Sequence, residues 1–233
     1  MLEIFAGESG LLEVCLETFG EYPVIMLEFP EVFALMALPN QDGVHGLDKA
    51  KQRLPQKFYG SVVGDEKRFF GMCRQFPEYL DSETTGSHLE GCIARIDIGD
   101  KAQQSKACPA GTHQALFIPP GPMRSLFTDL ELALENIADY ALFLGHRYSA
   151  PLCTSANLSG DPAGSITEID RAREFGKAAG LPLLIRCREQ AQSKGSYPVL
   201  SLGETHIQVE REGPGLDLIR SRFPDGIFRN KMN

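Results

Sequence analysis

A run of small hydroxylated residues in the last third of the chain is suited to holding a phosphate group. The run is Thr154-Ser-Ala-Asn-Leu-Ser-Gly160, and it follows a short apolar segment, 151–153, that we expect to be a strand. Small side chains leave backbone N–H groups accessible, and hydroxyl and amide groups add further donors for phosphate oxygens. An ordinary Ser/Asn turn leading into a helix has the same composition, and composition alone does not separate the two.

A second group of candidate residues is basic. Four positive charges fall within nine residues, at Lys49, Lys51, Arg53 and Lys57. They form either a local anion-binding patch or a solvated run of charge. The whole chain has a formal net charge of -8 and a pI near 5.2, so it lacks the broad basic field of an autonomous nucleic-acid binder.

Other residues that can do chemistry are dispersed. We expect each of the five histidines to be a surface residue or a satisfied polar residue; they are His45, His88, His113, His146 and His206. Asp42 and His45 share a segment, which can hold a base or form a simple turn. Glu131, Glu135 and Asp139 recur at helical spacing, which predicts a solvated helix face.

The cysteines and the chain's hydropathy bound the class of protein. The six cysteines form no C-x-x-C pair and have no histidine at zinc-ligand spacing, so we expect reduced thiols and no metal site. The N-terminus has no basic segment followed by a long apolar one, which argues against a secretory signal. The longest apolar run, 32–38, is too short to span a bilayer. We therefore expect a cytoplasmic protein with no membrane contact.

Hydrophobic periodicity predicts the elements that position these residues. We expect helices at 10–19, 67–80, 129–145 and 166–179, the last starting with a capping box formed by Ser165 and Glu168. Apolar or alternating runs predict strands at 23–27, 32–38, 58–63, 92–98, 114–118, 151–153, 181–185, 199–202 and 207–210. Turn-forming residues predict loops at 39–46, 83–88 and 100–113, and Pro119-Pro-Gly-Pro122 is expected to stop any regular element.

These elements predict the fold class. Strands outnumber helices and alternate irregularly with them, which favours an α/β (α+β-like) fold with a twisted mixed β-sheet and flanking helices. The 233 residues contain no internal repeat, low-complexity tract or clean linker, so we expect a single domain over 1–233.

Three motifs, taken together, point to a known family. Leu152-Cys-Thr-Ser-Ala-Asn-Leu-Ser-Gly-Asp-Pro162 contains a strand end followed by T-S-A-N-x-S-G, Lys51-Gln-Arg53 fits K-x-R, and Arg211-Glu-Gly213 fits R-x-G. In this order and approximate separation they resemble the YrdC-like family of threonylcarbamoyl-AMP synthases. The resemblance covers about residues 32–215 and leaves 1–31 and 216–233 as expected peripheral extensions.

The resemblance implies a nucleotidyltransferase that converts ATP, L-threonine and bicarbonate into threonylcarbamoyl-AMP and pyrophosphate. That product leads to threonylcarbamoyladenosine in tRNA, so tRNA or tRNA-modification proteins are the implied partners. The sheet would enclose a deep cavity in which Lys51 and Arg53 are the catalytic cations. Arg53 is suited to a paired contact with phosphate, and Lys51 to acting as a mobile point charge. Mg²⁺ is expected to be held mainly through the phosphates. The implied nucleotide-binding residues are Thr154, Ser155, Asn157, Ser196 and Arg211.

The sequence departs from the family pattern mainly where the amino acid is bound. The family's P-T-x-T-x-Y-G-L turn has its best counterpart in 39–47, where Asn40 and His45 replace a Thr and the Tyr as substrate-binding candidates. The family's helix between this turn and K-x-R finds no room, and its R-x-P becomes Phe117-Ile-Pro119. Ser196 stands for the first Ser of a later S-T-V-V-D strand, with the register shifted by one. The motifs that the family uses to bind phosphate therefore match this sequence better than the motif that it uses to bind the amino acid.

Three alternatives follow from these departures. One is a catalytically inactive module that binds a nucleotide or RNA in the same cavity. Another is a carbamoyl-adenylate enzyme that uses a different acceptor. The third is an accessory subunit that uses the fold only as a scaffold.

Overall fold

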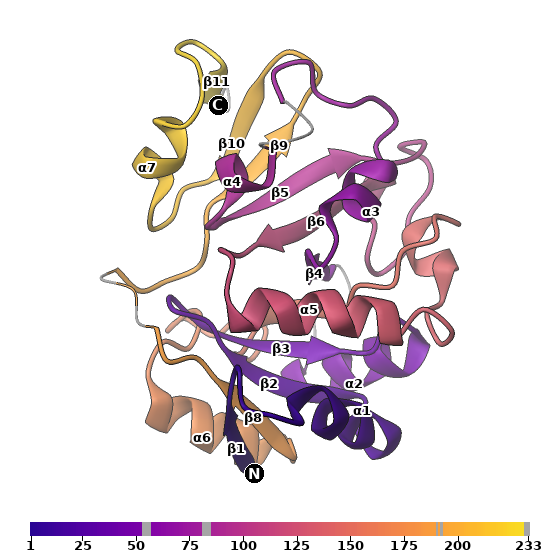
Figure 1. Ribbon diagram of the computed structural model, residues 1–233, viewed down its shortest axis with the longest axis vertical. Helices are drawn as coiled ribbons and strands as arrows, with labels where there is room; N and C mark the ends of the chain where they lie inside the picture. The colour runs from indigo at the N-terminus through magenta and orange to yellow at the C-terminus, as the bar shows by residue number, and fades with distance from the viewer. Residues whose placement is uncertain (53–56, 81–84, 190, 192, 231–233) are drawn as a thin grey trace.

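A single mixed sheet organises the chain. The computed structural model describes residues 1–52, 57–80, 85–189, 191 and 193–230. Among these residues eleven strands form one sheet in the order β1-β8-β2-β3-β7-β4-β6-β5-β9-β10-β11 (Figure 1). In chain order they are β1 (Leu2–Phe5), β2 (Val24–Glu28), β3 (Phe33–Ala37), β4 (Gly60–Val62), β5 (Cys92–Asp97), β6 (Thr112–Phe117), β7 (Leu152–Ser155), β8 (Leu183–Arg186), β9 (Val199–Leu202), β10 (Ile207–Arg211) and β11 (Phe228–Asn230).

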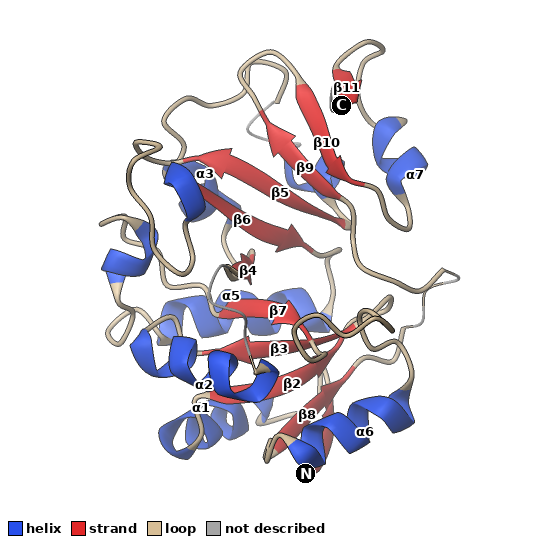
Figure 2. Ribbon diagram, turned by 180° about the vertical axis from the view of Figure 1, so that it is seen from behind, coloured by secondary structure: helices blue, strands red, loops and turns tan. Residues whose placement is uncertain are grey.

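Helices cover both faces of this sheet. Helices α1 (Leu11–Glu21) and α5 (Pro122–Ala133) contribute to one apolar core, and α2 (Gln41–Lys51) and α6 (Ile169–Ala178) contribute to another. Figure 1 shows α5 lying across the middle of the sheet, and Figure 2 shows α6 beside β8. The remaining short helices are α3 (Glu66–Gly71), α4 (Thr85–Leu89), η1 (Pro109–Gly111), η2 (Tyr140–Phe143) and α7 (Leu216–Arg220). The expected α/β architecture of a mixed sheet with flanking helices is confirmed.

The apolar runs predicted the buried strands well. Every residue of β2 and β3 is buried, as expected for continuous apolar runs in the interior of a sheet. The alternating segment at 92–98 forms β5 with the expected alternation of burial. Hydrophobic periodicity therefore located β2, β3 and β5 correctly, because the burial pattern of each strand is visible in its own residues.

Most of the segment 39–46, predicted as a loop, is instead the first part of helix α2, which begins at Gln41. Asn40 caps this helix, because its Oδ1 accepts a hydrogen bond from the Gly43 N–H at 3.1 Å. The two glycines serve close packing rather than a turn. A Cβ on Gly43 would lie 1.9 Å from the Leu38 carbonyl oxygen, and one on Gly46 would lie 2.6 Å from Val24 Cγ2. Their lack of a side chain lets the helix approach β2 and the end of β3.

The prediction of a helix over 129–145 was also wrong. Helix α5 begins at Pro122, within the proline-rich segment that was expected to stop regular structure, and ends at Ala133. Proline suits the first turn of a helix because its ring presets φ and its missing N–H has no intrahelical partner there. Helix α3 likewise ends at Gly71, well short of the 67–80 expected, and the predicted turn at 83–88 contains α4, with 83 and 84 lying outside the described residues.

Both ends of the chain belong to the folded body rather than to peripheral extensions. Strand β2 lies between β3 and β8, and β1 pairs in parallel with β8. Arg186 bridges Glu28 and Glu3 across these strands, with N–O distances of 2.5 and 3.0 Å. At the other end, Leu216 and Ile219 of α7 are buried in the core. Within the described ranges, no helix has both the length and the apolar character needed to cross a bilayer.

One acidic residue of α5 is buried instead of solvated. The Glu131 residue is 1% exposed, its Oε2 accepts a bond from the Asp65 N–H at 2.9 Å, and its buried Oε1 has no partner. Burial raises the pKa of Glu131 to about 7. The expectation of a solvated face at this position was therefore wrong.

We predict that Glu131→Gln makes the protein less sensitive to alkaline pH. The folded-state pKa lies above the ordinary value, so the stability contributed by the protonated form is lost as pH rises from about 4.5 through about 7. The stability difference between Glu131→Gln and the parent should grow by about 2–3 kcal/mol from pH 5 to pH 8.5 in favour of the variant. Urea denaturation at both pH values measures it.

Asp129→Asn, at an exposed position of the same helix, is the control and should change stability by less than about 0.5 kcal/mol at either pH. A pH-independent difference for Glu131→Gln would show that the carboxyl is not held protonated.

Candidate functional site

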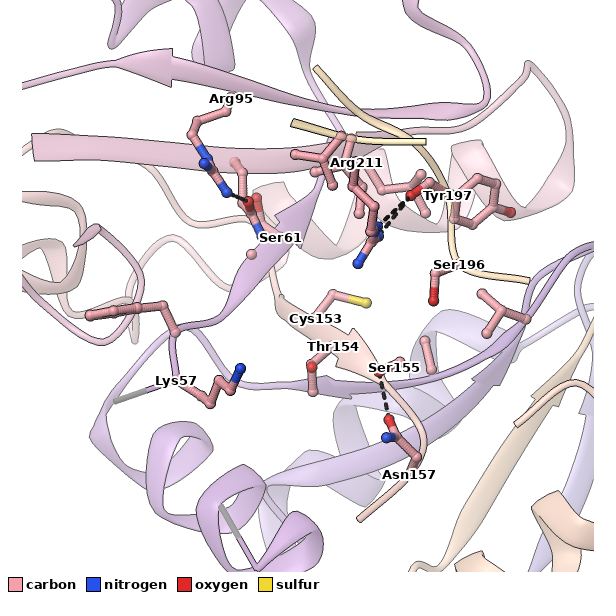
Figure 3. Close-up of a pocket in the computed structure, with 18 of the residues that line it drawn as sticks. Lys57, Ser61, Arg95, Cys153, Thr154, Ser155, Asn157, Ser196, Tyr197 and Arg211 are labelled. Carbon is pink, nitrogen blue, oxygen red and sulfur yellow. Dashed lines mark hydrogen bonds between the residues drawn. The ribbon is translucent and has the colours of Figure 1, made fainter. Parts of the chain in front are cut away.

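The loop after β7 opens onto a cavity of about 500 Å³. Residues of β3, β4, β5, β6, β7, β9 and β10 contribute to its walls, so the twisted sheet curves around it. Figure 3 shows Arg95 and Arg211 on one side of the cavity, and Thr154, Ser155 and Asn157 on the other. Among the described lining residues the cations are Lys51, Lys57, Arg95 and Arg211, and the single carboxylate is Glu210.

The conformation of the phosphate-binding candidate, residues 154–160, is set by its own side chains. The Ser155 hydroxyl donates to Asn157 Oδ1 at 2.6 Å, and Asn157 Nδ2 donates to the Leu158 carbonyl at 2.9 Å. The Ser159 N–H donates to the Lys51 carbonyl at 2.9 Å, which ties the loop to the end of α2. The Ser159 hydroxyl is buried without a hydrogen-bond partner on this same wall.

The Lys51 side chain is hydrogen-bonded to this loop. The residue is 1% exposed, and its ammonium donates to the Asn157 carbonyl at 2.8 Å, to Asn157 Oδ1 at 3.0 Å and to the Ser155 carbonyl. An ammonium has three N–H donors, so these contacts engage its donors with the loop. Lys51 lines the cavity, as expected, but as a fixed charge bonded to the loop rather than as a mobile one.

Two further expected residues lie across the cavity from this loop. Arg211 donates through Nε and Nη2 to the Tyr197 carbonyl, at 3.3 and 2.7 Å. The Ser196 hydroxyl is 2.7 Å from that of Ser165, so Ser165 braces the cavity wall. It does not form the predicted capping box, because α6 begins after Glu168, which makes no side-chain cap.

Arg95 is a cavity residue that the sequence analysis did not single out. It lies on β5 directly opposite Gln114 of β6, and its Nη2 donates to Gln114 Oε1 at 2.7 Å. Its Nε is buried without a hydrogen-bond partner. Arg211 is open to solvent overall, yet desolvation of its guanidinium and the nearby charge of Arg95 lower its pKa. An arginine in the middle of an alternating strand, on the same face as Ile93, was the available signal.

The two acceptor-site candidates lie outside the cavity. Asn40 is the cap of α2, and its Nδ2 donates to the Ile137 carbonyl at 3.3 Å. His45 is exposed on α2 beside Phe19 and Pro23. Asn40 caps a helix and His45 lies on it, so neither residue belongs to a turn and neither lines the cavity with the other candidates. Arg53 lies outside the described residues.

Helix α2 also resolves the apparent loss of a helix before the K-x-R motif. The helix is present, is separated from β3 only by residues 38–40, and carries Lys51 as its last residue. What this chain lacks between β3 and that helix is room for a separate turn. The hydroxyl groups that the resemblance places in such a turn are therefore absent from this part of the molecule.

A serine–histidine pair borders the cavity but faces the core. Ser61 Oγ lies 2.9 Å from His113 Nε2, and His113 Nδ1 lies 3.0 Å from the Ala107 carbonyl. His113 is fully buried, and burial lowers its pKa to about 4. With the Tyr148 hydroxyl 3.2 Å from Ser61, these groups form a satisfied buried network. They stabilise the core beside the cavity.

Among the described residues, one thiol, that of Cys153, lines the cavity. Burial raises the pKa of the cavity residue Cys153 to about 12, so its thiol stays protonated near neutral pH. All six cysteines are free thiols. No three His, Cys, Asp or Glu side chains of the described residues gather where they can hold a metal ion. The chemical capacity of the cavity is that of cations, hydroxyls and amides directed at an anion.

Comparison with solved structures identifies the fold. A variant of Sua5 from P. abyssi matches with a TM-score of 0.68 and 15% identity, over 98% of this chain and 65% of that one. P. abyssi Sua5 in complex with L-threonine matches with a TM-score of 0.65 and 15% identity, over 99% and 62% of the chains. E. coli YciO matches with a TM-score of 0.60 and 12% identity, over 91% and 94%.

The chain thus spans less than two-thirds of the length of Sua5. Neither a protein-family model nor a curated protein matches the sequence. The structural matches nevertheless confirm the YrdC-like fold implied by the three motifs, in a strongly diverged sequence.

We predict that the Lys51 ammonium is needed to hold the loop. Lys51→Met keeps an unbranched side chain but leaves the Ser155 and Asn157 carbonyls without their donor, so the free energy of unfolding should fall by about 2–3 kcal/mol. Urea denaturation measures the change. Lys49→Met, at an exposed position two residues earlier, is the control and should stay within about 0.5 kcal/mol of the parent. Equal effects of the two substitutions would contradict this role.

We also predict that Asn40 acts through helix capping. Asn40→Ala should lower the free energy of unfolding by about 1 kcal/mol, whereas Asn40→Asp, which keeps the accepting oxygen, should cost much less. Thermal or urea denaturation of the three proteins measures this difference. If the alanine variant is as stable as the parent, the cap does not contribute to folding.

Proposed function

We propose that the chain binds ATP in this cavity and forms the carbamoyl-adenylate of a small amine. The observation that carries this proposal is convergence: Lys51, the Thr154–Gly160 loop, Ser196 and Arg211 come from distant parts of the sequence and line one cavity. The fold shared with Sua5 and YciO supports the same family of reactions. L-threonine is the acceptor that the resemblance implies, and a Sua5 structure holds that amino acid.

The proposed reaction has a defined balance of atoms. The amine and bicarbonate combine to a carbamate with loss of water. A carbamate oxygen then attacks the α-phosphorus of ATP, a new P–O bond forms, and the bond to pyrophosphate breaks. Negative charge accumulates on the phosphate oxygens during this transfer, so fixed cations and N–H donors stabilise the transition state.

The residues of the site suit this charge distribution. Lys51 shapes the loop and places a positive charge beside it, and the Ser155 and Ser159 hydroxyls supply polar groups on the same wall. Arg211 supplies a guanidinium from the opposite wall. Because these groups are bonded in place before a ligand arrives, little reorganisation is required during phosphoryl transfer.

Mg²⁺ is proposed to arrive with ATP. Glu210 is the single carboxylate among the described lining residues, so the donor set suits an ion coordinated mainly by phosphate and water. Bound in this way, Mg²⁺ would neutralise part of the triphosphate charge.

A second candidate function is a nucleotide- or RNA-binding module without catalysis. The absence of the acceptor turn between β3 and α2 favours it, because a site that holds only the nucleotide needs no acceptor residues. A tRNA titration distinguishes this candidate: binding that weakens steeply with salt would support an RNA-binding module.

Pyrophosphate release tests the proposed enzyme. The protein is incubated with ATP, Mg²⁺, bicarbonate and a panel of amino acids that includes L-threonine. We expect release that depends on bicarbonate and on one class of amino acid. Ser155→Ala should lower kcat/KM by about tenfold or more, because it removes a polar group from the wall that faces the phosphates.

Ser125→Ala, on the exposed side of α5, is the matched control and should retain the parent rate. If ATP binds but no amino acid supports pyrophosphate release, the inactive module is the better description. If ATP does not bind, the assignment of the cavity to a nucleotide is wrong.

A further inference from the structure

The cavity wall opposite the Thr154–Gly160 loop carries two guanidinium groups. Arg95 extends from β5 and Arg211 from β10, and Figure 3 shows both directed into the cavity. Gln114 lies beside Arg95 on β6 and holds its Nη2 through a 2.7 Å bond. This hydrogen bond fixes the orientation of the Arg95 guanidinium.

These two cations are not neutralised by the described part of the chain. No ion pair of Arg95 or Arg211 with a carboxylate occurs among the described residues. Arg95 donates to the Gln114 amide oxygen, and Arg211 donates to the Tyr197 carbonyl. The buried Nε of Arg95 lacks any hydrogen-bond partner. Removing a guanidinium from water without an anionic partner is costly, so an anion that enters this wall recovers free energy.

The acceptor side of the cavity differs from the one that the resemblance implies. Only residues 38–40 separate β3 from α2. Asn40 caps that helix and His45 lies on it, and neither lines the cavity. The hydroxyl groups that the resemblance assigns to threonine binding are absent between β3 and α2. Arg95 on β5 lines the cavity. A second guanidinium on this wall can bind a side-chain carboxylate, which threonine lacks, in addition to the α-carboxylate that every amino acid carries.

We propose that Arg95, braced by Gln114, determines acceptor specificity by binding the side-chain carboxylate of an acidic amino acid. This inference rests on the proposed function and deepens it, because it assigns the substrate class of the same site. The Arg95 fork matches a planar carboxylate, and two parallel N–H···O bonds would fix the orientation of the acceptor. The acceptor amine is then free to carry the carbamate toward the α-phosphorus.

The proposal makes a charge-specific prediction. L-aspartate and L-asparagine have nearly the same shape and differ by one negative charge, as do L-glutamate and L-glutamine. A partly buried cationic group discriminates against the neutral analogue because part of its charge and hydrogen-bonding capacity is then left uncompensated. At least one acidic amino acid should therefore bind about tenfold or more tightly than its amide, and more tightly than L-threonine.

Calorimetric titration of the full chain tests this prediction. The α,β-methylene analogue of ATP is titrated first, and each of the five amino acids is then titrated with and without that analogue. The same series is run on Arg95→Met, on Arg95→Lys and on Arg229→Met, a control that removes an exposed arginine from β11. Thermal unfolding of each variant confirms that it is folded.

We expect Arg95→Met to reduce the acid-to-amide affinity ratio to near one while nucleotide affinity stays within about twofold. Arg95→Lys keeps the charge but not the fork, so it should retain part of the preference. Arg229→Met should behave as the parent.

Three results would overturn the proposal. In the first, the parent binds acid and amide equally; this measurement needs no variant. In the second, no amino acid binds although the nucleotide analogue does, which leaves the nucleotide assignment intact. In the third, Arg95→Met weakens the nucleotide analogue as strongly as the amino acid, which places Arg95 in the phosphate site. Failure of the parent to bind the nucleotide analogue would instead remove the proposed function on which the inference rests.

Discussion

The buried ammonium of Lys51 is the interaction on which the site depends. It sits at the last residue of α2 and bonds three oxygens of the segment 155–157, so it joins an N-terminal helix to a loop about a hundred residues later. This contact requires α2 to start and end at particular places. The Asn40 cap sets its beginning, and the close approach allowed by Gly43 and Gly46 sets its distance from the sheet. The loop is thereby shaped before any ligand is present.

The distribution of charge then gives the cavity its chemical character. One wall is the Thr154–Gly160 loop, which is rich in hydroxyl and amide groups and is bonded to the Lys51 ammonium. The opposite wall carries the guanidinium groups of Arg95 and Arg211. Such groups repel one another and lose hydration when they share a cavity, as the lowered pKa of Arg211 indicates. An anionic ligand relieves both costs. The site is thus arranged for anions in a chain whose overall charge is strongly negative.

Sequence patterns predicted those parts of the fold in which burial is continuous. The apolar runs of β2 and β3 identified central strands because a strand covered on both faces needs no polar alternation. The same reasoning failed where one residue type is compatible with two different local structures. Gly43 and Gly46 suggested a turn but permit close packing, and Pro122 suggested a break but begins a helix. Glu131 suggested a solvent-facing position but is buried against the backbone of Asp65.

The sequence by itself determined the local chemistry: a loop of small hydroxylated residues, a lysine and an arginine within a basic segment, and a late arginine. These depend on residue type and spacing, which the sequence states directly. Only the tertiary structure decided which side chains share the cavity. It placed Asn40 and His45 outside and Arg95 inside. The physical reason is that strand register and helix direction decide whether a side chain points into the cavity. Pairing between strands that are distant in the sequence sets both.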